Sequence, residues 1–228
     1  MNHPSTSPAA HGRRHTQWLA AAAALAAALS CSNCASTSKA AKEIRVSVRD
    51  QKAVLYERGE PVRVYGISTS KFGLGDSMNS CRTPVGQLRV VRKIGHGMPP
   101  GMVFKHRHAT GEILAPDAPG RDPVVTRILW LAGTDSNTRN TQRRCIYIHG
   151  TPEERNIGRP ASYGCVRMRS MDVIDLFNRT PVGTPVIIEK NGLPLEAKLM
   201  REYVYKAPSR PDRSPGTPIK ADTAVATR

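Results

Sequence analysis

The chain has 228 residues, a length that suits one domain of ordinary size with tails. Hydrophobic residues make up 39% and Gly and Pro number 18 each, so a moderate core and many turns are expected. The formal net charge of +16 suits a polyanionic partner, either nucleic acid, an anionic membrane surface or an acidic envelope polymer, and a solvated basic surface is the alternative. The sequence contains no RNA-recognition motif, paired Cys/His finger or basic heptad region, which disfavours nucleic acid.

Residues 1–34 have the pattern of an export signal. A basic start precedes an apolar run over residues 18–29, and small residues follow it. This run is too short to span a bilayer, which takes about 20 residues. Lipoprotein-type cleavage before Cys31 and ordinary cleavage near Ala35 remain alternatives. We therefore expect an exported protein of the periplasm or cell envelope, lipid-anchored through Cys31 under the first alternative.

The five cysteines divide by position. Cys31 and Cys34 belong to the processing region, whereas Cys81, Cys145 and Cys165 lie in the body of the chain. An odd number of thiols in an oxidising compartment leaves at least one unpaired. A disulfide between Cys81 and Cys145 stays open, because sequence does not give their separation.

Residues 35–42 form a short tether, and the folded domain is expected over residues 43–190. Apolar residues that alternate with polar ones, bounded by turn residues, predict strands. These segments are 44–48, 54–56, 62–67, 88–91, 128–131, 145–149 and 186–188. The second and third form a hairpin around Glu57–Glu60. Residues 94–122 predict a long surface excursion, with a hairpin inside it as an alternative.

One helix is expected near residues 170–180. Ser170 suits its N-cap, Asp172 its first turn, and Thr180-Pro181 its end. Its apolar face consists of Val173, Ile174 and Phe177. Residues 191–205 form a C-terminal extension, and residues 206–228 a disordered, basic, Pro-rich tail.

Two segments carry candidate chemistry, namely CIYIHGTPEE at 145–154 and ASYGCVRM at 161–168. Alternation along the strand places Cys145, Tyr147 and His149 on the face opposite the core, with His149 at the strand end. Gly164 permits a tight backbone just before Cys165, and backbone N–H groups there can face an oxyanion. An imidazole within reach lowers the pKa of a thiol from about 8.5 and supplies the thiolate.

These segments resemble the signature of the YkuD-type L,D-transpeptidase family, which runs His-Gly, a dozen or so residues, then Ser-His-Gly-Cys-(Ile/Val)-Arg-(Met/Leu). The likeness covers about residues 44–190 and includes RTPVGQLRV, TRILWLAG and DVIDLF. It implies a mainly β, sandwich-like catalytic domain with one or two short helices and no cofactor. Metal binding by His96, His106 and His108 is disfavoured, because their spacing fits no compact ligand set.

The resemblance also implies roles for individual residues. Cys165 matches the nucleophile, His149 the general base, and Gly150 the residue whose carbonyl orients the imidazole. The remaining matched positions belong to the oxyanion and substrate region, and they are Ser162, Tyr163, Gly164 and Arg167. Tyr163 departs from the family, which has His there, and a tyrosine with a pKa of about 10 cannot serve as a base near neutral pH.

The resemblance implies action on tetrapeptide stems of peptidoglycan. D-Ala leaves as a thioester forms on Cys165, and the acyl group passes to an amine. Three alternatives are open, namely a carboxypeptidase or amidase that trims stems, an enzyme that attaches or detaches an envelope protein, and a non-catalytic wall-binding relative. Besides the stems, anionic envelope polymers or a membrane are candidate partners, nucleic acid is not expected, and the oligomeric state is open.

Overall fold

The computed structural model describes Met1 and residues 41–193. The expected signal segment, both of its cysteines and the basic tail lie outside these residues. The first strand begins at Lys42, one residue ahead of the expected domain boundary. None of the helices in the described residues has the length and apolar character that crossing a bilayer requires.

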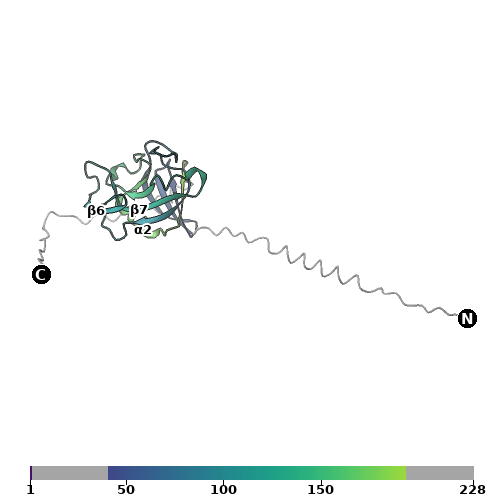
Figure 1. Cartoon of the computed structure of the whole chain (residues 1–228). Helices are drawn as coiled ribbons and strands as arrows, with labels where there is room; N and C mark the ends of the chain where they lie inside the picture. Colours follow the sequence, from purple (N-terminus) through teal and green to yellow (C-terminus); the bar gives the residue numbers. More distant parts are fainter. Residues whose placement is uncertain (2–40, 194–228) are drawn as a thin grey trace, which may run out of the picture. The chain divides into compact units, whose positions relative to one another are not determined.

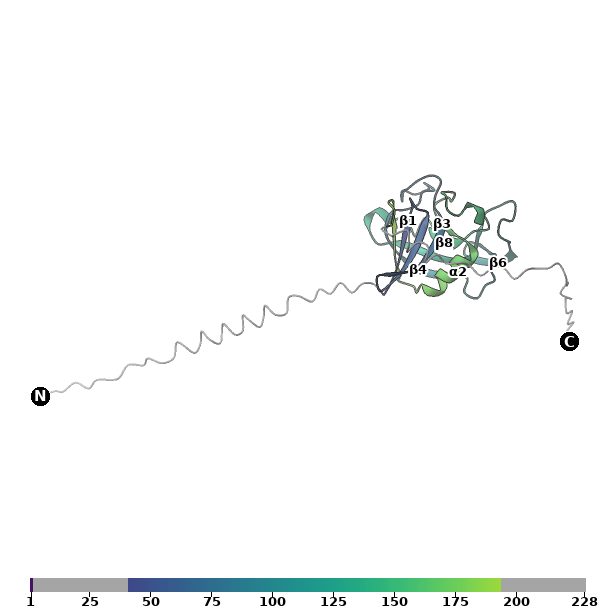
Figure 2. The same cartoon turned by 180° about the vertical axis from the view of Figure 1, so that it is seen from behind.

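Strands dominate the described part of the chain (Figures 1 and 2). The helical elements are the 3-10 turns η2 (Ser136–Thr138) and η3 (Glu154–Asn156) and the helix α2 (Ser170–Arg179). The strands are β1 (Lys42–Ser47), β2 (Lys52–Glu57), β3 (Glu60–Ser68), β4 (Gly86–Ile94), β5 (Met102–Lys105), β6 (His108–Ile113), β7 (Val124–Gly133), β8 (Tyr147–Gly150), β9 (Val166–Met168) and β10 (Pro185–Glu189).

The strands form one sheet that closes on itself. Its order is β4-β10-β1-β2-β3-β9-β8-β7-β5-β6, and β4 also pairs with β7. The apolar residues of the main core, such as Ile44, Val46 and Leu129, point into the enclosed space. Helix α2 packs against β7 and β8 (Figure 1). The expectation of a mainly β, sandwich-like domain is confirmed.

Local sequence accounts for most of these elements. All seven predicted strand segments correspond to strands. The first hairpin turns on Arg58 and Gly59, whose φ values of 52° and 84° give the two-residue turn that suits the twist of paired strands. The 94–122 excursion contains a hairpin, β5–β6, joined to β7 through β5.

One strand boundary was wrong and one strand was missed. Strand β8 begins at Tyr147, not at Cys145, because Cys145 has a left-handed φ of 56° and ends a turn. Strand β9 was not predicted, since three residues are too few for a visible alternation. It exists because it completes the sheet between β3 and β8.

The helix was placed correctly but its details differ. Arg169 occupies the N-cap, and the backbone N–H of Ser170 donates to the Glu154 carboxylate at 2.8 Å. The Ser170 hydroxyl lies 2.8 Å from Thr126 Oγ1, so it does not cap the helix. Ile174 is only half-buried, and the buried apolar face consists of Val173, Leu176 and Phe177.

Candidate functional site

Strands β8 and β9 bring the two candidate segments together. They are parallel neighbours, with Ile148 opposite Val166 and His149 opposite Arg167. Ile148 and Val166 belong to the main core. Because side chains alternate along a strand, His149 and Arg167 share the opposite face. Cys165 directly precedes β9 and packs with Tyr147, which lies two residues before His149 in β8. The sheet thus brings together the segments of His149 and Cys165, which are 16 positions apart in the sequence.

The His149 imidazole is buried, with 4% of its surface exposed. Its Nδ1 lies 2.7 Å from the Gly150 carbonyl oxygen. Because a carbonyl only accepts, Nδ1 carries the hydrogen, and Nε2 of the neutral ring keeps a free lone pair. Burial lowers the pKa of His149 to about 4, although the bond to Gly150 opposes this shift. His149 is therefore a neutral base at pH 7.

The Cys165 thiol is half-buried beside the start of β8. The backbone N–H of Tyr147 donates to its Sγ at 3.4 Å, and Sγ lies 3.6 Å from the Cys145 carbonyl oxygen. In the described structure its hydrogen bonds go to these backbone groups rather than to His149. Burial raises the pKa of Cys165 to about 11, against the opposing effect of the Tyr147 N–H. The resting pair is a thiol and an imidazole, both uncharged.

The loop before Cys165 is fixed by its own polar groups. The Ser162 hydroxyl donates to the Cys165 carbonyl at 2.6 Å and accepts the Gly164 N–H at 3.2 Å. The backbone N–H of Gly164, which was expected to face an oxyanion, therefore donates to the Ser162 hydroxyl instead. Gly164 has a φ of 123°, a conformation that favours glycine, and a Cβ there would make a tight contact of 3.3 Å with the Arg82 carbonyl oxygen.

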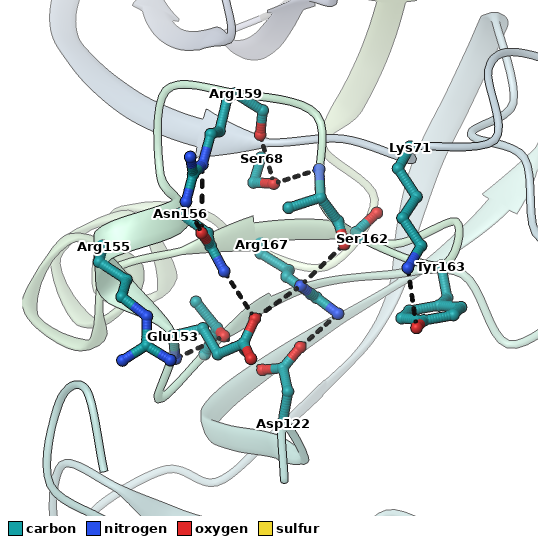
Figure 3. A network of polar contacts seen from close by, with 12 residues as sticks. Ser68, Lys71, Asp122, Glu153, Arg155, Asn156, Arg159, Ser162, Tyr163 and Arg167 are labelled. Carbon is teal, nitrogen blue, oxygen red and sulfur yellow. Dashed lines mark hydrogen bonds and ion pairs between the residues drawn. The ribbon is translucent and has the colours of Figure 1, made fainter. Parts of the chain in front are cut away.

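Arg167 is buried, and acidic groups surround it (Figure 3). It forms a close ion pair with Asp122 and a second with Glu153 at 3.7 Å, and it donates to the Ala161 carbonyl at 3.2 Å. Thr151 donates to the other oxygen of Asp122 at 2.5 Å. These contacts join the β6–β7 and β8–β9 loops beside β9.

Sequence reasoning missed Asp122 and Glu153. Asp122 ends the Gly/Pro-rich excursion and Glu153 follows the His-Gly-Thr-Pro segment, and both lie at least 14 positions from Arg167 in the sequence. Arg167 was a clue, because a buried arginine needs acidic partners.

A hollow of about 620 Å³ opens beside Arg167. Tyr163, which is 60% exposed, forms part of its wall. The other residues of the wall are Lys71, Gly120, Asp122, Glu153, Asn156, Arg159, Pro160, Ala161 and Arg167. Tyr163 and Arg167 flank Cys165 in the sequence, so the hollow adjoins the thiol segment.

Cys81 and Cys145 do not pair. Cys81 is exposed and Cys145 half-buried, and both are free thiols. Cys145 packs beside Cys165 against the cluster that contains Tyr147. The disulfide left open by the sequence is therefore not formed.

The fold and this site define a class of protein, namely a closed β domain that carries an imidazole on one of two parallel strands and a thiol directly before the other. The chain belongs to the YkuD family, the L,D-transpeptidase catalytic domain, whose sequence profile matches residues 41–188.

Individual relatives match shorter stretches. The chain is 42% identical to the putative L,D-transpeptidase YqjB of Bacillus subtilis over 52 residues, which are 23% of this chain and 30% of YqjB. It is 49% identical to the probable L,D-transpeptidase YbiS of Escherichia coli K12 over 43 residues, 19% of this chain and 14% of YbiS. A solved L,D-transpeptidase of Mycobacterium tuberculosis H37Rv is 18% identical, with a TM-score of 0.44 over 66% of this chain and 58% of its own. The chain thus spans less than two thirds of each of these proteins.

Proposed function

We propose that the chain is a cysteine-dependent L,D-transpeptidase that acts on tetrapeptide stems of peptidoglycan. The observation that supports this most is the pairing of β8 with β9, because Cys165 directly precedes β9 and the buried, neutral His149 lies in β8. Membership of the family supports the reaction class.

The reaction takes place in two acyl transfers. Cys165 Sγ attacks the carbonyl that precedes the terminal D-Ala, and Nε2 of His149 accepts the thiol proton. The C–N bond then breaks, the proton passes to the departing D-Ala amine, and a thioester remains on Cys165. An amine of a second stem attacks the thioester, giving an amide and restoring the thiol. Attack by water gives a trimmed stem instead.

The neutral resting pair suits this sequence of steps. A buried thiolate and imidazolium would both lack solvation, so the proton moves only as the sulfur bonds to carbon. His149 accepts a proton when it is neutral, which holds above its pKa of about 4. We therefore propose that turnover is lost on the acid side only near this pH.

The test is mass spectrometry of stem peptides after incubation with the purified chain. Cys165→Ala is expected to abolish D-Ala release, and His149→Gln to lower it by at least about a hundredfold, within the range for a general base. Cys81→Ser, which removes an exposed thiol, is the matched control and should retain activity. Turnover by Cys165→Ala at the wild-type rate would end the proposal. Adding an acceptor amine separates transfer from hydrolysis.

We also propose that the chain works outside the cytoplasmic membrane, where its substrate lies. The export pattern of residues 1–34 and the charge of +16, which suits an anionic envelope, support this placement. Fractionation of cells that express the full chain tests it, with Cys31→Ala to reveal a lipid anchor. Recovery of the active chain in the cytoplasm alone would contradict it.

A further inference from the structure

Lys71 lies at the rim of the hollow beside the thiol segment. Its ammonium donates to the Tyr163 hydroxyl at 3.0 Å and stands 4.4 Å from the centre of that ring (Figure 3). It also lies 5.3 Å from the centre of the Phe72 ring. In the described part of the chain no carboxylate lies within ion-pair distance of it. An ammonium has three donors, so two remain for a ligand.

The backbone holds this group in place. Ser70 and Ser162 form a parallel bridge, and the Lys71 N–H donates to the Ser162 carbonyl at 3.1 Å. Lys71 and Tyr163 are therefore fixed side by side although 92 positions separate them. The Phe72 and Tyr163 rings are 48% and 60% exposed, and their centres lie 5.5 Å apart, so they form an exposed aromatic pair.

The charges around the hollow leave a positive excess at the rim. Three basic and two acidic side chains line it. Both acids, Asp122 and Glu153, pair with the buried Arg167. Arg159 bonds the Asn156 amide oxygen at 3.1 Å and has no acidic partner in the described residues, as is the case for Lys71. An incoming carboxylate would find two unpaired cations here, and Lys71 is the one nearer Tyr163.

The hollow adjoins the segment that carries the thiol, through Tyr163 and Arg167 on either side of Cys165. Tyr163 precedes Cys165 by two residues, so their Cα atoms lie within about 7 Å. The terminal carboxylate of a stem lies one residue beyond the carbonyl that Cys165 would attack. The side-chain carboxylate of a diamino acid lies on the other side of that carbonyl, at a similar reach.

We propose that Lys71 binds a carboxylate of the stem peptide and that Tyr163 positions it. This inference rests on the proposed function and names its specificity-determining residue. It also gives Tyr163, which cannot act as a base, a part in the site through its hydroxyl and ring.

The experiment compares three donor tetrapeptides that have both carboxylates free, the terminal carboxylate amidated, or the side-chain carboxylate amidated. The variants are Lys71→Met, Lys71→Arg and Tyr163→Phe, with Lys190→Met as a matched exposed control. Lys71→Met should lower kcat/KM about tenfold for the free peptide, as expected for one hydrogen bond between charged groups. Amidation of the carboxylate that Lys71 binds removes the contact, so Lys71→Met should leave kcat/KM unchanged for that peptide. The peptide that is insensitive to the substitution therefore identifies the carboxylate. Lys71→Arg should retain most of the preference, and Tyr163→Phe should lose part of it.

Equal losses on all three peptides, or none, would overturn the assignment of Lys71 while leaving the proposed function intact. If the wild-type chain releases no product from any peptide, the proposed function fails. Equilibrium binding of the same peptides to Cys165→Ala, with and without Lys71→Met, then decides the question. Equal peptide affinities with and without Lys71→Met overturn the inference. A loss of affinity confined to the peptides in which the bound carboxylate is free supports it.

Discussion

At the residue scale, the Cys165 thiol and the His149 imidazole are both uncharged at neutral pH. Desolvation disfavours the charged form of each group, so it raises the pKa of Cys165 and lowers that of His149. The Arg167 charge favours a thiolate and opposes an imidazolium, but acidic partners surround that arginine. Under the proposed function, Cys165 therefore loses its proton only as its sulfur bonds to the substrate.

This state makes a prediction for alkylation of Cys165 by iodoacetamide, which needs the thiolate. Because burial raises the pKa of Cys165 to about 11, the rate should keep rising with pH and reach no plateau below about pH 10. His149→Gln should leave the profile unchanged, since the imidazole it removes is neutral. Site-resolved mass spectrometry gives the rate, with the unfolded chain as reference. A plateau below pH 8 that disappears in His149→Gln would show a thiolate–imidazolium pair instead.

At the element scale, a bulge in β7 fixes the end of β8. Val125 pairs with Gly150 and Ile128 with His149, so β7 has two extra residues, Thr126 and Arg127, opposite this step. The bulge contains Thr126, a buried β-branched residue with a φ of 71°, which is a strained conformation. Val125 and Thr126 pack closely against Gly150, whose carbonyl oxygen accepts the hydrogen bond from the His149 imidazole.

Gly150→Ala tests this contact. A Cβ there would lie 2.7 Å from the Val125 carbonyl oxygen and 3.0 Å from Thr126 Cβ, so the strand end must move. We expect kcat/KM to fall by about a hundredfold, because displacing a catalytic group by about 1 Å has an effect of this size. Gly192→Ala, where the new methyl group meets only the Asp50 carboxylate at 3.1 Å, is the control. Wild-type turnover by Gly150→Ala would show that the imidazole does not depend on this contact.

At the scale of the whole molecule, buried arginines join loops from distant parts of the chain. Arg144 pairs with Asp76 at 2.9 Å, both side chains being 5% exposed, and it donates to the Arg82 carbonyl at 2.6 Å. Arg144 lies in the turn that leads into β8, and its contacts attach this turn to the loop that follows β3. Arg167 does the same for the loops after β6 and β8.

Asp76→Ala is expected to destabilise the fold by about 3–5 kcal/mol, because it leaves the Arg144 charge buried without a partner. The midpoint of urea unfolding measures the loss. Glu112→Ala removes the partner of Arg121 in an exposed pair and should cost less than about 1 kcal/mol. Equal shifts in the two variants would mean that the buried pair stabilises the fold no more than the exposed pair does.

The sequence by itself determined seven of the strands, the place of the helix and the thiol and imidazole segments. These features depend on neighbours along the chain, such as the alternation that sends Ile146 and Ile148 into the core. It also determined the family, because the Cys165 and His149 segments form a long and specific motif.

Only the tertiary structure decided what surrounds those groups. The short strand β9, the acidic partners of Arg167 and the place of Lys71 beside Tyr163 arise when the sheet closes. The uncharged state of Cys165 and His149 likewise follows from burial by segments far away in the sequence. The physical reason is the same in each case, since solvation and ion pairing depend on distances in space, which the closed sheet sets and local sequence does not.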